Sequence, residues 1–298
     1  TSHVNYLKDK AKLHYACAIP SEGEHFFFAP HLYEISDLTV LEREVFGPVV
    51  HIIRFKAEEV DQVIRQINAT GYGLTMGVHS RIEQFTTQVA REIKAGNIYV
   101  NRNMIGAVVG VQPFGGRGLS GTGPKAGGPL YLERLVKDNL SVDCAVLDDT
   151  KKARLLAETT SSAVAYAMPA AATAQYKWSQ LTTSQRTSVL RQFLASLASN
   201  QVVSRQEPDL EQVLMVARAK LQRVELELNR PINLPGPTGE SNVLVLDPRG
   251  ILALLRDDSS SFSHWLLSII TALAAGNAVI TAVEDADLPE AEACIKAL

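Results

Sequence analysis

One stretch of the sequence, QPFGGRGLSGTGPKAGGPL at residues 112–130, has the composition of a backbone that approaches another group closely. Nine of the chain's nineteen glycines lie between Gly106 and Gly128, and residues 116–121 fit the G-x-G-x-x-G pattern of dinucleotide-binding loops. In such loops the pattern leads into a helix that faces the pyrophosphate. Here it leads into TGPKAGGPL, whose two prolines and three glycines cannot form that helix.

A nucleotide P-loop is also disfavoured. Its signature needs Gly-Lys followed by Ser or Thr, but Pro124 separates Gly123 from Lys125, and Ala126 stands where a metal-binding hydroxyl is required. Two interpretations of the stretch remain. It is either a packed glycine turn, or a source of backbone donors that line a pocket for a carboxylate.

Two shorter stretches also place polar groups where a ligand could bind. EREVFGPVV puts a carboxylate, Glu44, and an aromatic ring, Phe46, just before an apolar strand, although Gly-Pro at 47–48 also indicates an ordinary turn. NIYVNRN ends in Asn101 and Arg102, which fits either a binding position or the polar end of a strand. Neither stretch decides the function alone.

Composition limits the class of protein and its partners. At 298 residues, 46% hydrophobic and 20% charged, the chain is predicted to form about two globular domains. A net charge of −3 gives no general attraction for nucleic acid or anionic lipid, and no apolar run reaches the roughly 18 residues of a membrane span. Three scattered cysteines and seven scattered histidines predict no disulfide framework, no metal site and a reducing, cytoplasmic location.

The first half of the chain alternates strand and helix signals, which predicts an α/β fold with a wound parallel sheet. Strands are expected within 25–35, 49–55, 75–80 and 97–101, and helices within 57–71 and 81–96. Apolar residues follow helical spacing, and the residues expected to face inward are Val60, Val63, Ile64 and Ile67 in the first helix and Ile82, Phe85 and Val89 in the second. Gly71 and Gly96 are predicted to end these helices.

The pattern restarts after an Ala- and Ser-rich stretch at 155–175, which we interpret as the boundary region, and we assign the domains to residues 1–147 and 148–298. Thr182 or Thr183 is the expected N-cap of a helix. The elements predicted on either side of the boundary are a strand at 139–147, helices at 184–199, 208–228, 262–275 and 287–298, a turn-rich loop at 229–242, two strands within 242–257, and a strand after Gly276.

The order of the motifs is more specific than any one of them. E-x-F-G-P at 44–48, INATGYGL at 67–74, AGNIYVN at 95–101 and PFGGRGLSG at 113–121 together resemble the C-terminal part of the catalytic domain of the aldehyde dehydrogenase superfamily. The resemblance covers about residues 4–147. The longer string at 105–135 resembles the glutamate-semialdehyde dehydrogenases and, more narrowly, the C-terminal half of the fused bacterial proline-catabolic enzymes of the proline utilization A family.

The resemblance implies NAD as the cofactor. Glu44 would hold the nicotinamide ribose, since an acceptor-only carboxylate suits paired hydroxyl donors, and Phe46 would pack near the nicotinamide. Gly106 and Ala107 would present backbone N–H groups to the α-carboxylate of L-glutamate γ-semialdehyde, and Phe114 would line its aliphatic part. The family further implies a homo-oligomer, and FAD only in a proline dehydrogenase domain outside this sequence.

The second half resembles the start of a superfamily cofactor domain more faintly, through LPGPTGESNVLVLDPRGILALL and HWLLSIITALAAGNAVI. Active members have a lysine that binds the adenosine ribose on the strand after AGN, and Ala282 stands at that position here. A methyl group cannot replace a cationic donor. The resemblance therefore implies a partial Rossmann-like domain without activity of its own, as in long proline utilization A proteins.

The family's chemistry uses a cysteine nucleophile, hydride transfer to NAD and a carboxylate base. The resemblance places the nucleophile, an oxyanion-stabilising Asn and the base upstream of Thr1, so no catalytic residue is assigned. Cys17, Cys144 and Cys294 are expected to be small buried residues. We therefore expect an inactive fragment of a longer enzyme. Two alternatives stay open: an aldehyde dehydrogenase for another substrate, and a non-catalytic segment that serves assembly and covers a neighbouring active site.

Overall fold

A computed structural model describes residues 1–20, 22, 26–121, 123–132, 135, 161–256, 261–283 and 288–298. The chain divides into two compact units, residues 1–136 and 137–298, and each is considered by itself. The predicted boundary at residue 147, the strand predicted at 139–147 and Cys144 all lie outside the described residues.

The first unit begins with a three-stranded sheet of order β1-β2-β3. Its strands are β1 (Lys12–Ala16), β2 (His31–Glu34) and β3 (Val49–Ile52). β2 and β3 are parallel, whereas β1 is antiparallel to β2. Helix α1 (Ser2–Leu7) contributes Leu7 to a small core with Tyr33 and Ile35. The strands predicted within 25–35 and 49–55 are thus present, but they are shorter than expected.

A β-α-β unit follows, as the sequence predicts. Its elements are the 3-10 turn η3 (Ala57–Glu59), α2 (Val60–Ala69), β4 (Tyr72–Gly73), β5 (Thr75–Val78), α3 (Glu83–Glu92) and β6 (Asn97–Val100). β5 and β6 are parallel, with Thr75 opposite Asn97. Ile64, Val78 and Val89 form the core between helices and strands. Gly71, with φ of +76°, lies just after α2, which agrees with its predicted role as a terminator.

Two details of α3 correct the sequence prediction. Ile82 is 65% exposed, because it is the extended N-cap residue before the first helical turn and does not share the helical stripe. Its expected place in the core is taken by Ile93, which follows the helix. Gly96 does not end the helix, since α3 already ends at Glu92 and Gly96 leads directly into β6.

The remaining strand of this unit, β7 (Arg117–Gly118), pairs antiparallel with β4, and a short 3-10 turn, η2 (Leu38–Val40), precedes β3. The described strands of this unit thus form small sheets, in which some neighbouring strands are parallel and others are antiparallel. The α/β class is confirmed. The expectation of a parallel sheet holds for β2–β3 and β5–β6 but is wrong for β1–β2 and β4–β7.

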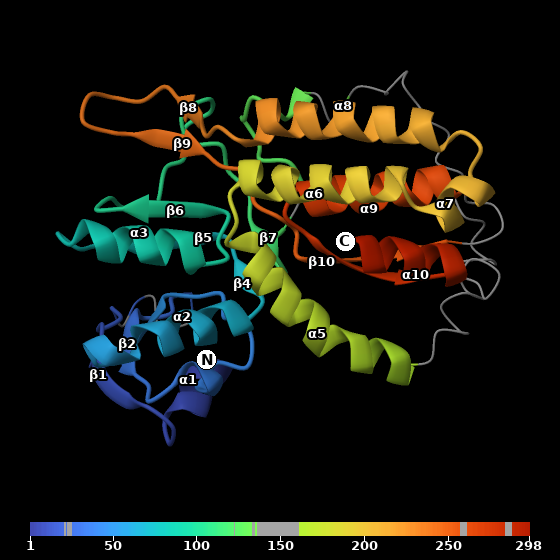
Figure 1. Cartoon of the computed structure of the whole chain (residues 1–298). Coiled ribbons are helices and arrows are strands. Elements are labelled where there is room, and N and C mark those ends of the chain that lie inside the picture. Colours follow the sequence, from blue (N-terminus) through green and yellow to red (C-terminus); the bar gives the residue numbers. More distant parts are fainter. Residues whose placement is uncertain are drawn as a thin grey trace. The chain divides into compact units, whose positions relative to one another are not determined.

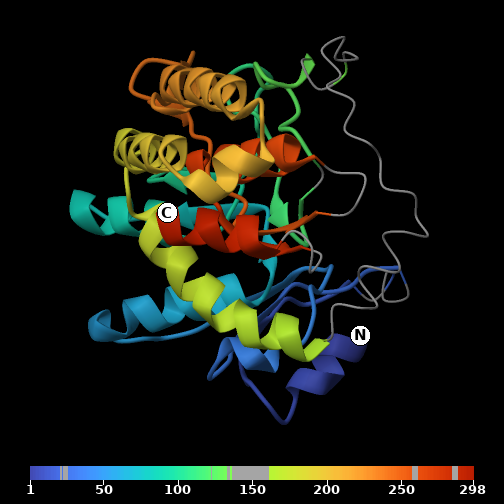
Figure 2. The same ribbon diagram turned by 45° about the vertical axis from the view of Figure 1, so that its right-hand side comes forward.

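The second unit is built mainly of helices. They are α5 (Ser161–Ser179), α6 (Thr183–Ala198), α7 (Gln201–Gln206), α8 (Leu210–Leu228), α9 (Phe262–Ala274) and α10 (Leu288–Ala297). Figures 1 and 2 both show the yellow α6 alongside the orange α8, and Leu190, Leu194 and Leu221 are fully buried in the shared core. Thr182 caps α6 in a reciprocal capping box with Gln185. No helix among the described residues is long and apolar enough to cross a bilayer.

A second β-α-β unit completes this part. β10 (Ile251–Leu255) and β11 (Ala278–Ala282) pair in parallel, and α9 connects them. Gly276, with φ of +89°, turns the chain from α9 into β11, as predicted. Two expectations need correction. Residues 232–234, expected in a loop, form β8 (Ile232–Leu234) opposite β9 (Asn242–Leu244), and the Ala-rich boundary stretch is helical from residue 161.

Candidate functional site

The G-x-G-x-x-G segment directs its backbone groups into the protein. Leu119 N–H donates to the Gly71 carbonyl at 2.9 Å, and Gly121 N–H donates to the Gly118 carbonyl at 2.9 Å. Ser120 contributes in both ways: its N–H donates to the Arg117 carbonyl, and its Oγ accepts from Gly73 N–H at 3.2 Å. These amides are therefore engaged, and residues 116–121 form a packed turn and not a phosphate cradle.

Glycine is required here for close approach of backbone to backbone. A Cβ on Gly73 would lie 2.1 Å from the Lys94 carbonyl oxygen, and one on Gly116 would lie 2.2 Å from that of Ser120. A Cβ on Gly96 would lie 1.8 Å from the Gly115 carbonyl oxygen. All three separations are far below van der Waals contact, so only hydrogen fits.

Lys125, which sequence reasoning treated only as a failed P-loop lysine, has a structural role. Its Nζ donates to the carbonyls of Gly96 and Gly115, the latter at 2.8 Å, and to Asn97 Oδ1 at 3.1 Å. Burial, helped by the positive charge of Arg117, lowers the pKa of Lys125. A lysine that follows a glycine-rich run was the only signal in the sequence, and it does not reveal which carbonyls the ammonium reaches.

Gly106 and Ala107 lie in an exposed irregular loop upstream of this packed segment. Gly106 has φ of +76°, and nothing lies within 4 Å of the position of a Cβ. The neighbouring amides are occupied: Ile105 N–H donates to Asn103 Oδ1 at 3.3 Å, and Val108 N–H donates to Gln112 Oε1 at 3.0 Å. Within the described part of the chain, the N–H groups of Gly106 and Ala107 have no acceptor.

Phe114 is half-buried and is fixed from the opposite side of the loop. Its N–H and carbonyl form two hydrogen bonds with Ala126, at 3.0 and 2.9 Å. Gly110 N–H donates to the Gly127 carbonyl at 2.9 Å. Residues 126–127 therefore hold both the segment that follows Gly106 and the segment that carries Phe114.

Glu44 lies beside a hollow of about 240 Å³ that is lined mainly by backbone-rich segments at 72–76 and 93–95, with Ser120 at its edge. Its side chain is exposed and free to accept hydrogen bonds from hydroxyl groups. Phe46 does not line this hollow, and it is 90% exposed. The structure thus brings Glu44 near the glycine-rich turn and leaves Phe46 pointing into solvent.

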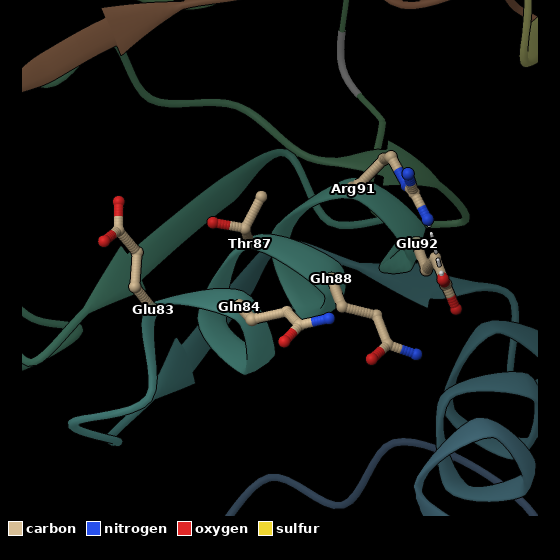
Figure 3. A pocket seen from close by; sticks show the side chains of 6 residues that line it. All are labelled: Glu83, Gln84, Thr87, Gln88, Arg91 and Glu92. Carbon is tan, nitrogen blue, oxygen red and sulfur yellow. Dashed lines mark hydrogen bonds and ion pairs between the residues drawn. The ribbon is translucent and has the colours of Figure 1, made fainter.

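A second, larger hollow of about 530 Å³ lies on α3 (Figure 3). Its lining residues all come from this one helix: Glu83, Gln84, Thr87, Gln88, Arg91 and Glu92. Gln88 donates to Asp61 Oδ1 at 2.8 Å, and Arg91 pairs with Glu92 at 3.4 Å. A ligand there would meet no second wall, so this surface is not a candidate site.

The cysteines and acidic groups of the described residues offer no alternative centre. Cys294 is 4% exposed, as expected for a core cysteine, but Cys17 is only half-buried, because it follows the exposed strand β1. Within the described ranges, no three His, Cys, Asp or Glu side chains are grouped as a metal site would require.

Comparison with known proteins identifies the segment that carries these residues. The profile of the aldehyde dehydrogenase family matches residues 3–139. Residues 3–139 belong to the aldehyde dehydrogenase family. Over a longer stretch, the chain is similar to the bifunctional protein PutA of Escherichia coli strain K12. The two are 41% identical over 254 residues, which is 85% of this chain and 16% of that protein.

This segment is also similar to parts of other proteins. PutA of Rhizobium meliloti is 53% identical over 135 residues, 45% of this chain and 11% of that protein. The 1-pyrroline-5-carboxylate dehydrogenase 1 of Halalkalibacterium halodurans is 45% identical over 111 residues, 36% of this chain and 21% of that protein. A crystal structure of proline utilization A from Bradyrhizobium japonicum is 53% identical over 46% of this chain and 14% of that one, with a TM-score of 0.44. The chain spans about one sixth of the length of the Escherichia coli relative.

Proposed function

We propose that the first unit forms part of the active site of an NAD-dependent L-glutamate γ-semialdehyde dehydrogenase within a longer, PutA-like protein. In that reaction the aldehyde becomes a carboxylic acid, water supplies the added oxygen, and NAD accepts the hydride. The nucleophile and base belong to parts of the protein outside this sequence, so the chain by itself is proposed to be inactive. A cytoplasmic homo-oligomer is part of the same proposal.

The observation that carries the proposal is the pair of adjacent backbone N–H groups at Gly106 and Ala107. The two residues are exposed, their N–H groups lack an acceptor among the described residues, and the N–H groups of Ile105 and Val108 on either side have acceptors. Two neighbouring N–H groups suit one carboxylate. The substrate of this reaction differs from a simple aldehyde by its α-amino acid group, so a carboxylate site is the feature that the function requires.

The other assigned residues fit the same substrate and cofactor. Phe114 supplies an apolar surface on the loop that also holds the Gly106 segment, and this suits the methylene groups of the semialdehyde. Glu44 beside its hollow is suited to accept hydrogen bonds from ribose hydroxyls. We keep Phe46 near the nicotinamide as part of the proposal, because an exposed ring on a loop is free to cover a bound cofactor.

For the second unit we propose a supporting role without dinucleotide binding. Ala282 ends β11, where the resemblance expects a lysine, and its carbonyl accepts from Arg256 N–H at 2.9 Å. No cationic side chain is therefore offered at that strand position. Titration of this chain with NAD by calorimetry is expected to show no heat from a site in this unit.

The decisive experiment replaces Gly106 by Val in the complete protein that contains this chain. A valine would strain the positive φ and cover the amide. We expect the KM for the semialdehyde to rise about 10-fold or more, as for lost hydrogen bonds to a charged group, while the KM for NAD stays within about twofold.

Gly110→Val is the matched control. Gly110 has nearly the same φ, +77°, and equally open space for a side chain, but its N–H already donates to Gly127. An equal rise in KM for both variants would show that loop strain is responsible. Equal effects of Gly106→Val on the semialdehyde and on acetaldehyde would favour an aldehyde dehydrogenase of another substrate.

A further inference from the structure

The backbone around Phe114 is unusually well held. Asn97 Nδ2 donates to the Pro113 carbonyl at 2.8 Å, and Asn97 Oδ1 accepts from Gly115 N–H at 3.2 Å. Lys125 Nζ donates to the Gly115 carbonyl at 2.8 Å. With the two bonds between Phe114 and Ala126, every backbone donor and acceptor from Pro113 to Gly115 has a partner within the protein.

Lys125 joins the parts of this arrangement. Its ammonium has three N–H donors, and the structure gives it three acceptors: the carbonyls of Gly96 and Gly115 and the side-chain oxygen of Asn97. It thereby ties the glycine-rich loop to the start of β6. The backbone at Gly96 lies directly against the Gly115 carbonyl. The ammonium therefore binds two carbonyl groups whose backbones are already in close contact.

The fit between the three N–H donors of Lys125 and its three acceptors depends on the compact shape of an ammonium group. A guanidinium is planar, and its donors form a rigid fork, so it cannot direct three N–H groups at acceptors gathered around one nitrogen. The lowered pKa of Lys125, caused mainly by burial, agrees with an amine removed from bulk water. An apolar replacement of the same length would leave two backbone carbonyls short of a donor.

We propose that Lys125, acting with Asn97, is a positioning residue that fixes Phe114 against the aliphatic part of the aldehyde substrate. The inference rests on the proposed function of the first unit, and it adds a residue that touches neither substrate nor cofactor. Loss of the ammonium frees the Gly115 carbonyl, loosens the Phe114–Ala126 pair and lets the ring move. Lys125 takes no part in the chemical step, so its loss is expected to raise the KM for the substrate and to leave kcat nearly unchanged.

The test compares three substitutions, Lys125→Met, Lys125→Arg and Lys125→Gln, with one surface control. The control is Lys8→Met, at an exposed residue that directly follows α1. In the complete protein we expect Lys125→Met to raise the KM for the semialdehyde about 10-fold, with kcat and the KM for NAD within about twofold. Lys125→Arg is expected to resemble Lys125→Met, and Lys125→Gln, which keeps a donor, to lie between it and wild type. If Lys125→Met does not fold, Lys125→Gln carries the comparison.

Hydrogen exchange on this chain provides a readout independent of activity. The amides of Phe114 and Ala126 are expected to exchange faster in Lys125→Met than in wild type or Lys8→Met. Unchanged exchange in both Lys125→Met and Lys125→Gln would overturn the positioning role. Faster exchange with unchanged KM would instead remove Phe114 from the substrate pocket, a result that the Gly106→Val experiment does not depend on.

Discussion

Gly96 lies directly against Gly115, so that a Cβ on Gly96 would come within 1.8 Å of the Gly115 carbonyl oxygen. Lys125 Nζ approaches the same oxygen at 2.8 Å. The start of β6 and the glycine-rich loop are therefore joined at one carbonyl group, and the first prediction concerns this contact.

Gly96→Ala is expected to destabilise the first unit by about 3 kcal/mol or more, at the upper end of the range for overpacking. The matched control is Gly77→Ala in the paired strand β5, where the added Cβ would meet only the flexible side chain of Met104, at 3.0 Å. We expect a cost below about 1 kcal/mol there. Native-state hydrogen exchange of the β5 and β6 amides measures both, and equal losses of protection would contradict the steric argument.

The second prediction concerns Arg186, which is 8% exposed. Its guanidinium donates to the Ala274 carbonyl at the end of α9, to the Leu181 carbonyl and to Thr183 Oγ1. Arg186→Met is expected to cost about 3 kcal/mol, because buried carbonyls lose a charged donor.

Arg223→Met is the control for this change, since the side chain of Arg223 is 74% exposed and pairs with Glu227 one turn along α8. A cost below about 0.5 kcal/mol is expected there. Both tryptophans of the chain, Trp178 and Trp265, lie in the second unit, so their fluorescence during urea denaturation reports this unit. Similar midpoints for the two variants would show that Arg186 contributes no more than a surface arginine.

The third prediction is a pH dependence. Hydrogen bonds from Arg191, at 2.7 Å, and from Thr187 lower the pKa of Glu225 from 4.5 to about 2. A lowered folded-state pKa stabilises the fold fully above pH 4.5, and that contribution is lost as the pH falls towards 2.

Glu225→Gln is therefore expected to cost about 1 kcal/mol at pH 7, as for a well-formed but partly exposed pair. The difference from wild type should shrink as the pH falls through the range from 4.5 to about 2. Urea midpoints from tryptophan fluorescence at several pH values measure it. A difference that stays constant down to pH 2 would mean that the carboxylate charge is not responsible.

The fourth prediction tests the cofactor assignment in the complete protein. Glu44→Gln is expected to raise the KM for NAD about 10-fold, because the paired hydroxyls lose a charged acceptor, with little change in the KM for the aldehyde. Glu42→Gln, two residues away on the same exposed segment and outside the hollow, is expected to leave both values unchanged. Equal effects of the two substitutions would assign the change to the loop and not to Glu44.

The sequence predicted the elements whose signals are local. Helical spacing identified α2, the choice of Thr182 or Thr183 was resolved in favour of the capping box at Thr182, and Gly71 and Gly276 adopt the positive φ expected after a helix. Ordered motifs also identified the family. The helix, its cap and the two glycine turns depend on residues within one or two turns of each other.

The failures depend on distant contacts. Gly96 has the sequence of a helix terminator, but its role is set by the carbonyl of Gly115, 19 residues later. Lys125 gains its role from Gly96 and Asn97. Residues 232–234 form a strand because residues 242–244 pair with them. The local pattern of prolines and glycines between the two segments does not predict this pairing.

With every backbone group from Pro113 to Gly115 occupied, the loop has no main-chain polarity left to offer a ligand at that point. In the proposed site, Phe114 would therefore discriminate between substrates by their size, whereas the amides of Gly106 and Ala107 would discriminate by their charge. The proposal thus divides substrate selectivity between two short segments, one that uses steric contact and one that uses hydrogen bonds to a charged group. Because residues 126–127 are hydrogen-bonded to both segments, changes at the two segments are expected to be coupled and to depart from additivity in free energy.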